Sequence, residues 1–87
     1  MIFVFEGKSI DPSDKNLFFD HSLSLHKTFD SAKAALDIEK NYLLKNQFSL
    51  TSFKLFDDSG KNSIECLLTD CFSNERILTV NEWSVFD

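Results

Sequence analysis

The spacing of hydrophobic and polar residues changes along the chain, and each spacing predicts a different element. The opening segment IFVFE alternates β-branched and aromatic side chains until Gly7, a pattern typical of a strand. The DPSD segment at residues 11–14 favours a turn, because proline fixes its own φ and aspartate bonds to nearby backbone. A second strand is expected over roughly Leu17 to Leu25, so the chain begins with two strands.

The segment KTFDSAKAALDIEKNYLLKNQ has the period of an amphipathic helix of about four to five turns. Thr28 suits the N-cap, and Asp30 lies in the first turn, where the helix dipole favours an anion. Lys45 lies near the other end, where a cation is favoured, and Asn46 is expected to end the helix in a left-handed conformation.

Two further strands are expected after the helix. The segment FSLTSFKLF (48–56) fits a strand whose apolar phase shifts by one residue near Thr51, which predicts a β-bulge. The DDSG segment (57–60) predicts a hairpin turn into a strand across SIECLLTDCF (63–72).

The last residues fit two structures. Thr79 and Glu82 have capping-box spacing, which favours a short strand at Arg76 to Leu78 and then a helical turn over Val80 to Phe86. The threonine and valine content of ILTVNEWSVF (77–86) also allows one last strand.

The order of elements predicts one small α+β domain spanning residues 1–87. Its expected architecture is β-β-α-β-β followed by a fifth strand or short helix, with one antiparallel sheet packed against one amphipathic helix. A chain of 87 residues has little surface to bury, and its ten phenylalanines supply much of the apolar area that a core needs.

The net charge of −5 and the scattered lysines argue against two classes of partner. Binding to nucleic acid or to an anionic membrane needs clustered cations, which the sequence lacks. A secretory signal is not evident and no apolar run approaches membrane-spanning length, so a cytoplasmic protein is expected. Cys66 and Cys71 would point to opposite faces of one strand, so we expect two reduced thiols that pack as small core residues.

Glu39 is the anomalous residue of the predicted helix. On a helical wheel it falls inside the apolar arc formed by Ala32, Ala35, Leu36, Tyr42 and Leu43. A buried carboxylate needs a partner, so Glu39 should face the sheet, be at least half buried and be hydrogen-bonded. Three roles fit: a structural carboxylate, part of a partner-binding surface, or a general acid or base. As structural partners we consider Tyr42, Trp83, a Ser or Thr hydroxyl, and Arg76.

The alternation of the second strand bears on its histidine. If the leucines at 23 and 25 face the core, His21 faces it too, while Ser22 and Ser24 point the other way. His21 and His26 then diverge and cannot share a metal ion. A hydrogen-bonded pair of His21 and Glu39 is our hypothesis for how the carboxylate is satisfied.

The remaining motifs point to no chemistry. Gly7 and Gly60 cannot build a glycine-rich phosphate loop, the spacing before Gly60 does not match a calcium loop, and Cys71 has no basic neighbour to activate it. We expect no metal and no cofactor. Trp83, with Val85 and Phe86, either closes the core or anchors another protein.

A protein-binding role is therefore favoured over an enzyme. We expect a small acidic module that contacts another protein and acts as an inhibitor or adaptor. Small acidic proteins of phages and mobile elements provide an analogy for this role. The chain could also form a homodimer through an edge strand or the Trp83 region. The expected partner-binding residues are Trp83, Val85, Phe86, Glu39 and His21. One alternative is a hydrolase-like or ligand-binding domain that uses Glu39 and His21. Another is an acidic DNA mimic.

Overall fold

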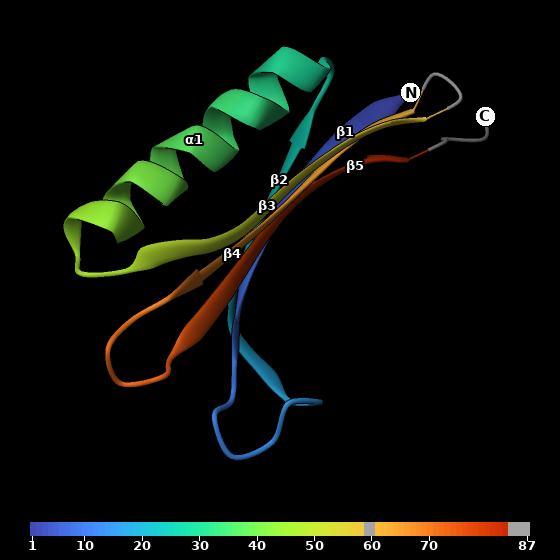
Figure 1. The fold of residues 1–87 in the computed structure, drawn as a ribbon. Helices are drawn as coiled ribbons and strands as arrows, with labels where there is room; N and C mark the ends of the chain where they lie inside the picture. The colour runs from blue at the N-terminus through green and yellow to red at the C-terminus, as the bar shows by residue number, and fades with distance from the viewer. Residues whose placement is uncertain (59–60, 84–87) are drawn as a thin grey trace.

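The computed structural model describes residues 1–58 and 61–83 (Figure 1). One helix and five strands follow one another as β1 (Ile2–Ile10), β2 (Phe18–His26), α1 (Phe29–Lys45), β3 (Ser49–Asp58), β4 (Lys61–Thr69) and β5 (Glu75–Trp83). This order confirms the predicted α+β class and its single antiparallel sheet.

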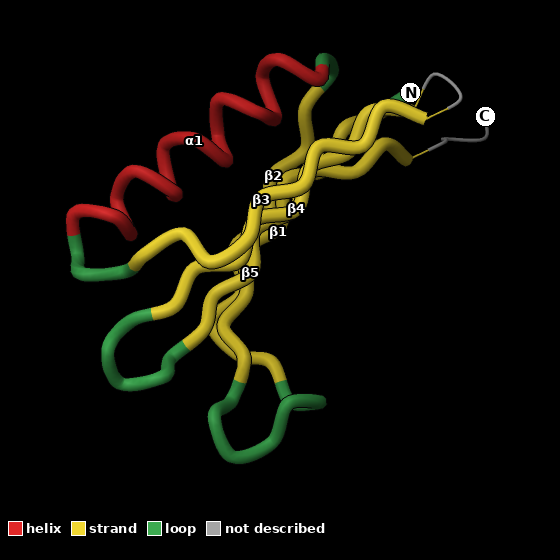
Figure 2. The backbone as a smooth tube through the Cα atoms, in the orientation of Figure 1, coloured by secondary structure: helices red, strands yellow, loops and turns green. Residues whose placement is uncertain are grey.

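The strands are arranged in the order β2-β1-β5-β4-β3, and each pair of neighbours is antiparallel. The first and last strands therefore lie next to each other, and β2 and β3 form the two edges. Because α1 connects these edges, it must cross the sheet. Figure 2 shows that it lies on one side only. The other side of the sheet has no layer over it among the described residues.

The core fills the space between α1 and the sheet. Because neighbours along a strand point to opposite faces, odd residues of β1 and even residues of β4 and β5 point toward the helix. The buried cluster consists of Ala32, Leu36 and Leu43 from α1 and Phe5, Ile64, Cys66, Leu68, Leu78 and Val80 from the strands.

The helix begins as predicted and ends differently. The Thr28 side chain accepts a hydrogen bond of 3.2 Å from the Ser31 N–H, which confirms the N-cap. The prediction that Asn46 is left-handed is wrong, because its φ is −106° and Gln47 has the positive φ, at 70°. Asn46 instead donates its side-chain amide to the Tyr42 carbonyl at 2.7 Å and so satisfies a group that the helix leaves free.

The favoured helical turn over Val80 to Phe86 is wrong in its described part. The strand β5 continues to Trp83, which pairs with Ile2, and Val80 is fully buried opposite Phe5. Pairing with β1 and burial of Val80 outweigh the local capping signal. Residues 84–86 lie outside the described part of the chain, as does the tip of the predicted hairpin turn at 57–60.

The predicted bulge in β3 is present, because its register against β4 shifts between Leu50 and Ser52. The strand predicted to run to Phe72 ends at Thr69, and Cys71 lies in the turn that follows. Both cysteines are free, and Cys66 is buried, but Cys71 is exposed and not a core residue as expected. The turn after Thr69 is held by the Asp70 carboxylate, which leaves Cys71 outside the sheet.

Candidate functional site

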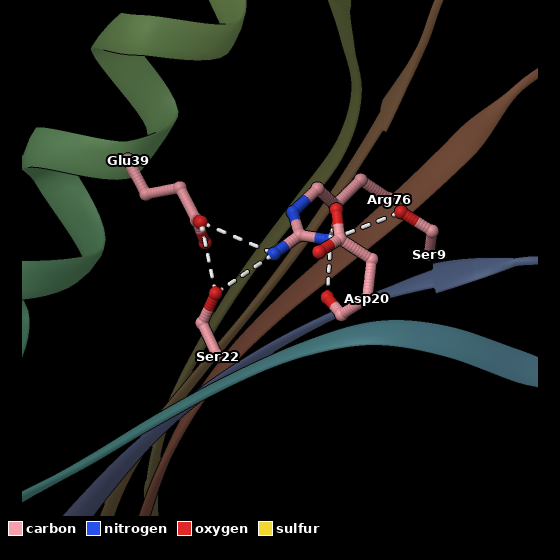
Figure 3. Close-up of polar contacts among 5 residues, drawn as sticks. All are labelled: Ser9, Asp20, Ser22, Glu39 and Arg76. Atoms are coloured by element: carbon pink, nitrogen blue, oxygen red, sulfur yellow. Dashed lines mark hydrogen bonds and ion pairs between the residues drawn. The ribbon is translucent and has the colours of Figure 1, made fainter.

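Arg76 of β5 is a charged residue beneath the helix, with only 6% of its surface exposed. Its Nη1 donates to the Ser9 hydroxyl at 2.9 Å and to the Asp20 carbonyl at 2.8 Å. Its Nη2 donates to the Ser22 hydroxyl at 3.0 Å and to Glu39 Oε1 at 3.1 Å (Figure 3). Arg76 therefore ties together β1, β2, β5 and α1, and we call these five residues the Arg76 cluster.

The predicted placement of Glu39 is confirmed. Its side chain faces the sheet with 22% of its surface exposed, and it is bonded to Arg76, one of the partners considered from the sequence. The Ser22 hydroxyl also donates to Oε1, at 3.4 Å. Glu39 Oε2 is buried without a hydrogen-bond partner among the described residues. The predicted pair with His21 is wrong, since His21 is exposed.

Gly7 provides the space that the ion pair occupies. A Cβ at this position would collide with Glu39 Oε2 and would lie 3.0 Å from Leu78 Cδ2 and 3.2 Å from Arg76 Nη2. The absence of a side chain lets the carboxylate and the guanidinium lie directly over the β1 backbone. Gly7 was expected to end the first strand, but β1 continues to Ile10, and Gly7 leaves room for the Arg76 cluster.

Arg76 also fixes the course of the edge strand β2. The register between β1 and β2 shifts between Gly7 and Ser9, and Asp20 has a φ of 56° at this irregularity. Arg76 holds the Asp20 carbonyl at 2.8 Å, with the Asp20 carboxylate 3.5 Å from Nη1. Beyond this point Ser22, opposite Gly7, faces the helix.

The predicted alternation of β2 is therefore inverted. Ser22 reaches Arg76, and His26 Nδ1 lies 2.8 Å from the hydroxyl of Ser31 on α1, so the polar residues face the helix. Leu23 and Leu25 point away from it, and each is 61% exposed. The expectation that the leucines face the core followed from hydrophobicity alone. The irregularity between Gly7 and Ser9, together with the polar contacts of β2 with β5 and α1, instead holds β2 with its serines toward the helix and its leucines away from it.

The side of the sheet opposite α1, the open face, is consequently rich in apolar side chains. It comprises the even residues of β1, the odd residues of β5, the odd residues of β4 from Ser63, and Phe18, Leu23, Leu25, Ser49, Ser52, Lys54 and Phe56. Its most exposed members are Leu23 and Leu25, with Trp83 at 56%, Phe56 at 46% and Phe18 at 39%. A pocket of about 220 Å³ lies where this face meets the end of β2, lined by Ile2, Leu25, His26 and Lys27.

The described charges of the open face are matched in pairs. Lys8 Nζ lies 3.5 Å from the Glu6 carboxylate, and Glu75 is bonded to Lys15 from the loop before β2. Lys54 and Glu65 are direct neighbours across β3 and β4. This face therefore combines exposed apolar groups with little net charge.

The structure separates the residues proposed from the sequence as a binding site. Trp83 lies on the open face and does not close the core, while Glu39 lies on the helix side of the sheet. His21 is exposed on edge strand β2, and Val85 and Phe86 lie outside the described residues. Sequence reasoning missed Leu23 and Leu25, because the SLSLH pattern (22–26) fits either face equally well.

Comparisons with family models, curated proteins and solved structures found no match. The described part of the chain contains no helix that is long and apolar enough to cross a membrane. Within residues 1–58 and 61–83, His, Cys, Asp and Glu side chains form no group of three or more that could hold a metal ion.

Proposed function

We propose that this chain is a protein-binding module that acts as an inhibitor or adaptor by contacting another protein through its open face. The observation that carries the proposal is the arrangement of β2, whose leucines face outward while its serines face the helix. A strand in an isolated domain would gain stability by burying its leucines. Leaving two of them exposed on one face is typical of a surface that another protein covers.

The rest of the open face supports the same function. Trp83 lies on the open face at the end of β5, and exposed aromatic residues often carry much of the binding energy of an interface. Matched charges around the apolar groups suit the polar rim of an interface. The two free cysteines support a cytoplasmic location.

The alternatives gain no support from the geometry. A hydrolase-like site would need Glu39 and His21 in one pocket, whereas Glu39 is bonded to Arg76 and His21 is exposed on β2. A DNA mimic would need unpaired carboxylates gathered on one surface, whereas the described carboxylates of the open face each have a lysine beside them.

A pair of matched variants tests the proposal. Leu25 on edge strand β2 and Leu55 on edge strand β3 are 61% and 60% exposed, but Leu55 pairs with Ile64 and so lies on the helix side. Threonine suits a strand and removes the apolar side chain at either position. In affinity capture from the native host, Leu55→Thr should retain the partners of the unmodified chain, and Leu25→Thr should lose them. Equal capture by both variants would exclude the open face as the binding surface.

A further inference from the structure

The size of the open face matches what a stable protein interface needs. Its five strands are nine or ten residues long, which at ordinary strand spacing and rise gives a face of roughly 700 Å². Stable interfaces of standard size bury about 800 Å² on each partner. A second surface as broad as this sheet could therefore cover the apolar groups from Leu25 on one edge strand to Phe56 on the other.

The balanced charge of the open face favours a partner surface that is itself close to neutral. The described side chains of this face give three carboxylates, those of Glu6, Glu65 and Glu75, and each has a lysine beside it. The described side chains of this face therefore contribute little net charge. A strongly basic partner would find no unmatched carboxylate here, whereas a neutral apolar face would meet no net repulsion.

We infer that the occupant of the open face is a second copy of this chain, packed sheet against sheet. The inference rests on the proposed function of this face as a protein-binding surface, and it names the protein bound there as another copy of the chain. A second copy supplies a surface of the same area, the same apolar groups and the same balanced charges. Sheets that pack face to face lie about 10 Å apart, and their inner side chains interdigitate.

The arrangement of the dimer follows from the position of the helix. Because α1 lies on the side opposite the open face, both helices point outward, away from the interface (Figure 1). The dimer presents two identical helix faces on opposite sides.

Mass in solution tests the inference first. The chain has a mass of 10.0 kDa, and sedimentation equilibrium on the complete chain should give twice that mass at micromolar concentration. Leu25→Lys places a charge in the interface and should weaken self-association by about tenfold or more, whereas Leu55→Lys should leave it unchanged. Circular dichroism of both variants checks that the fold is intact, and Leu23→Lys replaces Leu25→Lys if that variant does not fold.

Trp83 reports which face is involved. It is the single tryptophan of the chain and lies on the open face, so acrylamide should quench its fluorescence weakly in the dimer and more strongly on dilution or in Leu25→Lys. A dimer whose mass and Trp83 quenching do not respond to Leu25→Lys would overturn the assignment in favour of an edge-strand contact. A chain that stays monomeric would overturn the second copy as occupant. Capture of another protein that Leu25→Thr abolishes would then still support the proposed function.

Discussion

The guanidinium of Arg76 and the carboxylate of Glu39 meet 3.1 Å apart between β5 and α1. Arg76 is almost fully buried, and Glu39 keeps about a fifth of its side chain in contact with solvent. The cost of removing both charges from water is offset by their attraction and by the Ser9, Ser22 and Asp20 groups that complete the guanidinium's hydrogen bonds. The pair also fixes β2, whose outward leucines carry the proposed binding function.

Removal of Arg76 should destabilise the fold strongly. Arg76→Met leaves the Glu39 carboxylate partly buried without its cation and releases the Asp20 carbonyl, so a loss of about 3 kcal/mol in the free energy of unfolding is expected. Urea denaturation followed by circular dichroism measures it. The double variant Arg76→Met/Glu39→Met should lose less than the two single variants combined, because neither charge is then left alone. Additive losses would show that the two residues do not stabilise each other.

Gly7→Ala tests the close packing over β1. The new Cβ would collide with Glu39 Oε2 and crowd Leu78, so the free energy of unfolding should fall by about 1–3 kcal/mol. In a Glu39→Ala background the same change should cost clearly less, since the carboxylate no longer occupies the space. Equal costs in the two backgrounds would place the strain elsewhere, for example at the Leu78 methyl group.

The elements that the sequence predicts well depend on local signals. The hydrophobic period of residues 29–45 and the Thr28 cap depend only on residues close together in the sequence. The same period correctly places Glu39 toward the sheet. The phase shift of β3 near Thr51 is likewise visible as a break in alternation, and the structure has a bulge there.

The failures depend on residues far apart in the chain. The outward direction of Leu23 and Leu25 is set by Arg76, more than 50 residues later, which holds Asp20 and Ser22. The tail extends as a strand because β1 lies beside it, which a capping motif at Thr79 and Glu82 cannot reveal. The sequence indicates Arg76 only as one possible partner of Glu39, because no neighbouring residue predicts that Arg76 is buried.

The orientation of the helix can be tested with one residue on its buried side, Leu36, and one on its exposed side, Ile38. Leu36 is fully buried against the sheet, whereas Ile38 is 73% exposed. Leu36→Ala should lower the free energy of unfolding by about 2–5 kcal/mol, because it leaves a cavity in the core. Ile38→Ala should change it by less than about 0.5 kcal/mol. Similar losses in denaturant titrations of the two variants would mean that α1 is rotated or covered on its outer side.

The turn after β4 should show an acid-dependent contribution from Asp70. Its carboxylate accepts hydrogen bonds from the Asn74 side chain and from the backbone N–H groups of Phe72 and Asn74, each at 2.9 Å. These bonds, the Asn74 side chain first, lower the pKa of Asp70 below its ordinary value. Because the pKa is lower in the folded chain, the stabilisation is present above the unfolded value and is lost as pH falls through the folded one.

Asn74→Ala removes the largest cause of this shift, so the pKa of Asp70 should rise toward its ordinary value. Carboxyl-detected NMR titration measures the change at single residues. Asp11, whose pKa is lowered chiefly by the Ser13 hydroxyl in a different turn, serves as the internal control and should not move. An unchanged Asp70 pKa in Asn74→Ala would show that the two backbone donors alone keep the carboxylate ionised.

Gln47 offers a site where a substitution should stabilise the chain. It has a φ of 70° immediately after the helix, a conformation that costs a residue with a Cβ about 1 kcal/mol and that glycine adopts freely. Gln47→Gly should therefore raise the free energy of unfolding by about 0.5 kcal/mol, after the greater flexibility of glycine in the unfolded chain is counted. Asn46→Gly is the matched control, because Asn46 has a negative φ and donates to Tyr42, so its replacement should destabilise the chain. Thermal unfolding of the two variants should shift the midpoint in opposite directions, and a shared direction would contradict this account of how the helix ends.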